Sequence, residues 1–174
     1  MTDGAIIKSL PGGREPHLDR TSFVAQGAAI VGAVTLAANT SVWYNAVLRA
    51  DSNTIAVGEG SNLQDGVAVH VDAGFPTVIG RNVSVGHNAV VHGCTVEDDC
   101  LIGMGSVVLS GAVIGAGSLV AGGAVVLEGF VVPPGSLVAG VPAKVRRPLT
   151  PEEQASIRSN AANYIANAAL HRSE

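Results

Sequence analysis

Aromatic residues are almost absent from this sequence and make up only 3% of the 174 residues. Because 47% of the chain is hydrophobic, its core must be built from Val, Ile, Leu and Ala. Cysteine is also scarce, and without an export signal we expect Cys94 and Cys100 to be reduced thiols. A net charge of −4 gives no electrostatic basis for binding nucleic acid. These shortages exclude an aromatic-rich core, a disulfide scaffold and a basic nucleic-acid surface.

Long apolar runs are missing too. No segment approaches the length of a membrane span, and the first residues lack the apolar centre of a signal peptide. We therefore expect a cytoplasmic protein of one domain's length with no membrane partner.

The chain is rich in a six-residue repeat. An aliphatic residue recurs every sixth position, with two longer steps, after Leu48 and Val69, and one five-residue step before Val96. Small residues tend to fall four positions after each anchor, and Gly, Asn or Asp fills many turns. The anchors are Val24, Ile30, Leu36, Val42, Leu48, Val57, Leu63, Val69, Ile79, Val85, Val91, Val96, Ile102, Val108, Ile114, Val120, Val126 and Val132.

A sustained period of six predicts a parallel β-helix. The pattern resembles the left-handed hexapeptide-repeat solenoid, an all-β fold in which three hexads form one triangular coil. Stacked coils would lie about 4.8 Å apart, which is the strand spacing of a sheet. Narrow corners and a thin interior explain the 22 glycines and the rarity of aromatic side chains.

Two regions flank the repeat within the predicted domains 1–148 and 149–174. Residues 1 to about 20 are interpreted as a strand and loop, and the proline-rich segment 131–145 ends the repeat. Thr150, Pro151 and Glu153 predict a helix start with a capping box. The helix is expected to end near Leu170 and to pack on the solenoid or on a neighbouring subunit. Its predicted apolar face consists of Ala155, Ile157, Ala161, Ala162, Ile165 and Ala169.

The phase of the repeat predicts where three of the five histidines lie. Three anchors begin hexads one coil apart if the two longer steps are corner loops. The residues that follow these anchors would therefore stack on one outward face. They are Arg49, His70 and His92. Asp65 and His87 each lie two positions after an anchor of a different face, and would stack there.

Adjacent rungs allow His70 and His92 to share one metal, whereas His87 cannot join them within one chain. A threefold assembly would bring His87 from a neighbour if one face met the other face of the next chain. Three neutral imidazoles with one open position form a catalytic zinc site. The alternative is that these histidines contact only water.

The runs N-L-Q-D-G-V-A-V-H (62–70), V-G-H-N-A-V-V-H-G-C (85–94) and L-R-A-D (48–51) resemble the γ-class carbonic anhydrases. The resemblance covers roughly residues 20 to 148. It implies a homotrimer in which His70 and His92 of one chain and His87 of the next hold Zn²⁺, with Fe²⁺ or Co²⁺ as alternatives. It also implies reversible hydration of CO2 to bicarbonate, with metal-bound hydroxide as the nucleophile.

The resemblance further assigns polar residues around the metal. Asn62 and Gln64 would bond the metal-bound water or the substrate. Arg49 and Asp65 would pair across the interface, and Asp51 would belong to the same network. The alternatives are turn chemistry for Asp51 and Asn62, a solvated amide for Gln64, and a purely structural salt bridge for Arg49 and Asp65.

Three further residues bear on activity. Tyr164 resembles a tyrosine that some relatives place near the metal, and plain packing is its alternative. Ser52 stands where the best-known member has a glutamate. The loop 71–78 is short, and Asp72 is its only acid, so the proton-shuttling loop of that member is missing.

Two other functions remain open at this point. One is an acyltransferase on the same solenoid, which would use one histidine as a base and hold coenzyme A between subunits. The other is a non-catalytic protein that binds a metal or a siderophore.

Overall fold

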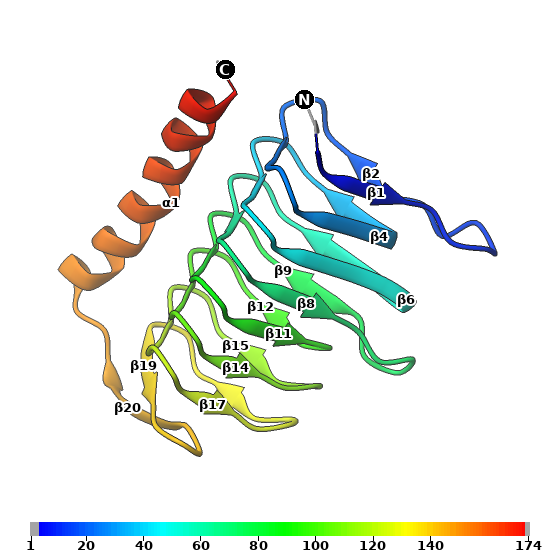
Figure 1. The fold of residues 1–174 in the computed structure, drawn as a ribbon. Helices are drawn as coiled ribbons and strands as arrows, with labels where there is room; N and C mark the ends of the chain where they lie inside the picture. The colour runs from blue at the N-terminus through cyan, green and yellow to red at the C-terminus, as the bar shows by residue number, and fades with distance from the viewer. Residues whose placement is uncertain (1–3, 173–174) are drawn as a thin grey trace.

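The structure is a computed structural model that describes residues 4–172. The outer ends of the predicted domains 1–148 and 149–174 fall on residues outside this range. The chain forms a left-handed parallel β-solenoid of about seven turns, followed by one helix (Figure 1). The fold predicted from the repeat is therefore confirmed.

The strands stack into three faces. The first face is formed by β3 (Phe23–Val24), β5 (Ser41–Val42), β7 (Asn62–Leu63), β10 (Ser84–Val85), β13 (Leu101–Ile102), β16 (Leu119–Val120) and β19 (Ser136–Ala139). The second face is formed by β1 (Ile6–Lys8), the first halves of β4 (Ala29–Leu36) and β6 (Val47–Val57), and then β8 (Ala68–His70), β11 (Val90–His92), β14 (Val107–Val108) and β17 (Val125–Val126). The third face is formed by β2 (His17–Leu18), the second halves of β4 and β6, and then β9 (Thr77–Ile79), β12 (Thr95–Val96), β15 (Val113–Ile114) and β18 (Val131–Val132). All these neighbours pair in parallel, and β20 (Lys144–Pro148) closes the first face as an antiparallel strand.

The core is the column of repeat anchors. None of the predicted anchors from Val24 to Val132 is more than 2% exposed. Small residues four positions later, such as Ala28, Ala46 and Cys100, are fully buried beside them. Both thiols are free, and burial raises the pKa of Cys94 and of Cys100 to about 12. Because a metal binds the thiolate, neither cysteine is suited to be a soft ligand at neutral pH.

One of the two expected corner loops is instead a strand. β6 runs unbroken from Val47 to Val57, and burial alternates along its middle. Its two halves pair with β8 and β9, so the extra residues of the first longer step extend the strand around the corner. The second longer step, residues 71–76, does form a loop after β8.

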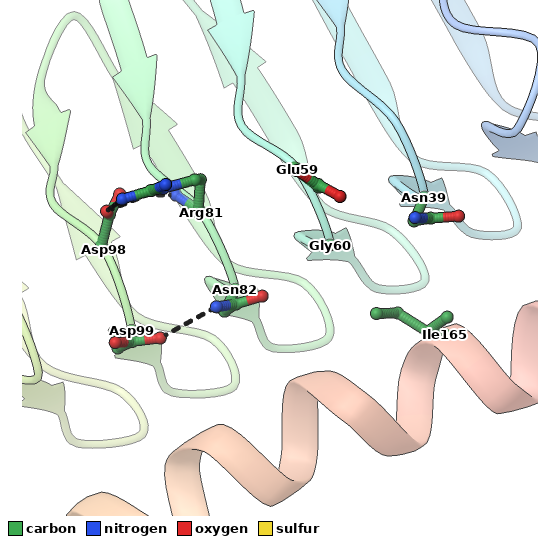
Figure 2. Close-up of a pocket in the computed structure, with 8 residues that line it drawn as sticks. All are labelled: Asn39, Glu59, Gly60, Arg81, Asn82, Asp98, Asp99 and Ile165. Carbon is green, nitrogen blue, oxygen red and sulfur yellow. Dashed lines mark hydrogen bonds and ion pairs between the residues drawn. The ribbon is translucent and has the colours of Figure 1, made fainter.

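Short polar residues in left-handed backbone form the corners between the third and first faces. Asn39, Asn82 and Asp99 have φ of 58°, 54° and 58°, and Gly60, with φ of 70°, occupies the same corner on the coil between Asn39 and Asn82. The Asn82 amide donates to Asp99 at 3.1 Å, and the Arg81 guanidinium pairs with Asp98 at 2.8 Å (Figure 2). They line a cavity of about 330 Å³ that includes this ion pair and none of the predicted site residues.

The helix α1 (Pro151–His171) lies along the solenoid, beginning near its last coils and ending near its first (Figure 1). The predicted capping box is present: the Thr150 hydroxyl accepts from Glu153 N, and the Glu153 carboxylate accepts from Thr150 N. α1 packs against β5, β7 and β10 of its own chain. No helix in the described range combines the length and apolar character needed to cross a membrane.

The predicted apolar face of α1 is partly wrong. Ile157, Ala161 and Ala168 are buried. The exposed members of the predicted face are Ala155, Ala162, Ile165 and Ala169. The true contact stripe includes Tyr164, whose ring meets Trp43 edge-on at 5.4 Å. Alanines occur around the whole helix and Ile165 is exposed, so apolar residue type alone does not identify the buried stripe.

The cap predicts a pH-dependent contribution to stability. Arg147 forms a bidentate ion pair with Glu153, and this pair, followed by the bond from Thr150 N, lowers the pKa of Glu153 to about 2. Folding thus favours the ionised form of Glu153. Its contribution to the stability of the fold is complete above pH 4.5 and is lost as the pH falls from 4.5 to about 2.

We expect Glu153→Gln to lower the thermal midpoint at pH 7, and the difference from wild type to shrink as pH falls through that window. Glu128→Gln, at an exposed turn, is the control that should show no such trend. Circular dichroism melts from pH 2 to 7 measure both. A pH-independent difference for Glu153→Gln would contradict the role of its charge.

Candidate metal centre

Two imidazoles face each other on adjacent rungs of the second face. The strand register aligns Arg49 with His70 and His70 with His92, so the predicted stacking of these three residues is confirmed. His70 Nδ1 lies 3.0 Å from His92 Nε2. Both side chains are partly exposed beside each other at the surface of the solenoid.

The second nitrogen of His70 is held by an acid. His70 Nε2 lies 2.9 Å from Asp51 Oδ1, and Arg49 pairs with the other oxygen of Asp51. The hydrogen bond from His70, and then that from Arg49, lowers the pKa of the Asp51 carboxyl. The bond also fixes His70 Nε2 as the protonated nitrogen and leaves Nδ1 toward His92.

The other two histidines show the same arrangement. His92 Nδ1 lies 3.0 Å from Ser110 Oγ, and His87 Nδ1 lies 2.8 Å from Asp65 Oδ2. Each of the three imidazoles therefore has one nitrogen bonded to an acid or a hydroxyl, and the second nitrogens of His70 and His92 lie 3.0 Å from each other. Histidines that bind metals usually have this second hydrogen bond, which orients the ring.

Asp65 and His87 stack on adjacent coils, as predicted, but they lie in turns and not on a strand of that face. Both occupy turns that lead from the first face to the second, one coil apart. In the range 4–172, no group of three or more His, Cys, Asp or Glu side chains converges on a common metal position. The third donor is thus separate from His70 and His92 within one chain.

The donor set nevertheless fits a divalent metal. With Zn–N bonds of about 2.0–2.1 Å in a tetrahedral site, two ligand nitrogens lie about 3.3 Å apart. The observed 3.0 Å between His70 and His92 is close to this separation. Three neutral nitrogen donors, each with an acid or hydroxyl behind it, suit zinc, iron or cobalt.

Asn62 and Gln64 form a buried amide pair. Asn62 is 1% exposed on β7 and donates to Ser84 Oγ at 2.9 Å, while Gln64 is 6% exposed and donates to Asn62 Oδ1 at 3.1 Å. Asp51 lies within β6. The alternatives of turn chemistry for Asp51 and Asn62, and of a solvated amide for Gln64, are therefore wrong.

Tyr164 and His87 line one cavity of about 400 Å³ between α1 and the solenoid, together with Gln64 and Asn160. Burial, and then the charge of Asp65, raises the pKa of Tyr164. The tyrosine also packs on Trp43, which confirms the packing interpretation. A place for Tyr164 near the metal stays a prediction.

Ser110 was not among the predicted site residues. Its separation of 18 residues from His92 is one full coil, which places it on the next rung, and this signal could have identified it. Arg49 and Asp65, predicted as partners, contact Asp51 and His87 instead in this single chain. Their pairing across an interface stays a prediction.

The hexad repeats and their stacked coils define a hexapeptide-repeat protein. Residues 76–108 and 93–128 match the family model "Bacterial transferase hexapeptide (six repeats)". A Bacillus cereus crystal structure, named there as a proposed acetyltransferase, superposes with a TM-score of 0.95 at 33% identity, covering 98% of both chains.

Curated relatives narrow the class. A Methanocaldococcus jannaschii protein named "Probable carbonic anhydrase" is 54% identical over 142 residues, which are 82% of this chain and 89% of that protein. "Gamma carbonic anhydrase 2, mitochondrial" of Arabidopsis thaliana is 45% identical over 167 residues, or 92% of this chain, which spans 60% of that relative's length. The chain belongs to the γ-class carbonic anhydrase family.

The predicted cytoplasmic location is wrong by the same comparison. Three Arabidopsis relatives, 44–50% identical to this chain, are named as mitochondrial proteins. The absence of an apolar signal segment, on which the prediction was based, does not bear on mitochondrial import, because transit peptides are amphipathic rather than apolar.

Proposed function

We propose that this protein is a metal-dependent carbonic anhydrase that interconverts CO2 and bicarbonate at a site shared between subunits of a homotrimer. One observation carries the proposal. His70, His87 and His92 each have one nitrogen hydrogen-bonded to an acid or hydroxyl and the other left for a metal. The names of the curated relatives support the same activity.

A neighbour is needed to complete the site. His70 and His92 lie on the second face, while His87 lies at the turn that leads from the first face. A heterologous contact repeated around a threefold axis closes a ring and gives every chain the same environment. In such a ring, His87 of one chain would join His70 and His92 of the next, and Arg49 would come near the partner's Asp65.

When bound, a divalent metal activates water for attack at neutral pH. The protein's part is to hold the three donor nitrogens and to orient what approaches them. Asn62 has both ends of its amide engaged, by Ser84 and by Gln64, so it acts as a support. The bond to Asn62 fixes Gln64 Nε2 and leaves the Gln64 carbonyl oxygen as the acceptor that can orient water or bicarbonate beside His87.

Metal analysis of anaerobically purified protein, paired with stopped-flow CO2 hydration and a mass measurement, tests the proposal. We expect about one metal per chain, three chains per particle, and hydration that disappears on chelation and returns with Zn²⁺ or Fe²⁺. Undiminished hydration by metal-stripped protein, or a monomer that binds metal and is active, would contradict it. A stoichiometric metal without hydration in either metal form would favour the non-catalytic binder.

An acyltransferase is the second candidate, because the Bacillus cereus structure is named for that activity. Such an enzyme needs one histidine as a general base. Here three histidines each have one nitrogen hydrogen-bonded to an acid or a hydroxyl, which is more than a single general base requires. Acetyl-CoA turnover by metal-stripped protein would support this candidate.

A further inference from the structure

A second acid reaches the His70–His92 pair through Ser110. The Ser110 hydroxyl donates to Asp72 Oδ2 at 2.7 Å and lies 3.0 Å from His92 Nδ1, while Asp72 Oδ2 is 3.7 Å from the same nitrogen. Ser110 is buried and Asp72 is half-exposed. The three side chains form one hydrogen-bonded chain, bent at Ser110, from the short loop to the imidazole.

The hydrogen bonds among Asp72, Ser110 and His92 determine the tautomer of His92. An ionised carboxylate only accepts hydrogen bonds, so the single Ser110 proton is directed at Asp72. The Ser110 oxygen can then only accept, and the proton that it accepts is that of His92 Nδ1. Neutral His92 therefore has its lone pair on Nε2, the nitrogen that faces His70.

The loop is built to hold Asp72 in place. Asp72 and Phe75 exchange backbone hydrogen bonds of 3.2 and 3.0 Å, and Asn53 donates to the Asp72 carbonyl at 3.2 Å. A side chain at Gly93 would come within 2.7 Å of Ser110 Oγ and 3.0 Å of Phe75. The absence of a side chain at Gly93 thus lets the loop and Ser110 lie against the rung of His92.

We propose that Ser110 and Asp72 are positioning residues for the metal site: they hold His92 as the Nδ1–H tautomer, so that Nε2 is ready to bind a divalent cation. The inference rests on the proposed function, since it concerns the same site. It gives the short loop a task other than proton shuttling. Hydrogen bonds of this kind behind a ligand are worth about 10–100-fold in metal affinity.

The test combines zinc affinity, measured by chelator competition, with ¹⁵N NMR of the histidine-labelled, metal-free full chain. We expect Ser110→Ala to weaken zinc binding about 10–100-fold and to remove the Nδ1–H preference of His92. Ser106→Ala is the matched control: this buried hydroxyl lies on the other side of β14, donates to Gly103 O at 2.7 Å, and should change neither readout.

Two variants at the exposed end of the hydrogen-bonded chain keep the proposal falsifiable if Ser110→Ala folds poorly. Asp72→Asn retains an oxygen acceptor for Ser110 and should keep the tautomer, whereas Asp72→Ala should lose it. Weakened zinc binding without a tautomer change would show a merely structural role and overturn the proposal, as would no change in either readout. If the wild-type chain binds no zinc, the proposed function fails, and the tautomer of metal-free His92 still decides this inference.

Discussion

His92→Ala should lose nearly all bound metal and reduce CO2 hydration to the uncatalysed background. The substitution removes one of two nitrogens that lie 3.0 Å apart on adjacent rungs, and two remaining donors from different chains hold a divalent ion weakly. Because the side chain is on the surface of the solenoid, the fold should be retained. Elemental analysis and stopped-flow hydration measure both effects.

His17→Ala is the matched control, because His17 is exposed and pairs only loosely with Glu15, at 4.0 Å. It should keep full metal and activity. A His92→Ala protein with one metal per chain and undiminished hydration would contradict the site.

The shared site also predicts complementation. His87→Ala and His92→Ala chains should each be inactive alone, but a mixed ring contains one interface where an intact His70 and His92 meet an intact His87. Co-expressed chains should therefore recover about one third of the sites in each mixed trimer. No recovery in purified mixed trimers would show that His87 does not come from a neighbour.

The second large effect is on stability. Ile102→Ala should lower the free energy of unfolding by about 2–5 kcal/mol, the usual range for truncating a buried aliphatic side chain. Ile102 is fully buried on β13, between Val85 and Val120 on the neighbouring coils. The side chains paired with it on both neighbouring coils are short valines, which cannot reach into the cavity, so little of the loss should be recovered.

Urea unfolding at fixed protein concentration measures the change, because the stability of an oligomer depends on concentration. Leu127→Ala, at a position 49% exposed, is the control and should change stability by less than about 0.5 kcal/mol. Equal effects of the two variants would contradict the assignment of the anchors to the core.

The six-residue period predicted most of the fold because each hexad places its aliphatic anchor in the core in the same way. The buried anchors and the stacking of His70 on His92 both follow from counting residues. The step from Leu48 to Val57 was harder to interpret, since its length fits either a loop or a longer strand. The alternating burial of β6 shows that the period-two pattern within this segment was the better signal.

The polar site was less predictable, because it depends on contacts between distant coils. Ser110 and Asp72 are 38 residues apart, and their contact requires the conformation of the loop between β8 and β9. The burial of Gln64 likewise depends on the neighbouring coils of the solenoid and on α1, which packs against β7. Counting residues along the repeat predicts whether a side chain points inward or outward. It does not predict which other segments cover an outward side chain.

The return of α1 along the stack has a mechanical consequence. Each coil of a solenoid touches only the coils beside it, so the end coils of a bare stack are free to fray. Here the segment before α1 is attached to the last coils by the hydrogen bond from Leu149 N to Gly135 O. At the other end of α1, His171 Nδ1 lies within hydrogen-bond distance of the Tyr44 hydroxyl. Both ends of the helical segment are therefore attached to the solenoid. Opening a coil near either end also requires breaking the hydrogen bond that the segment makes there.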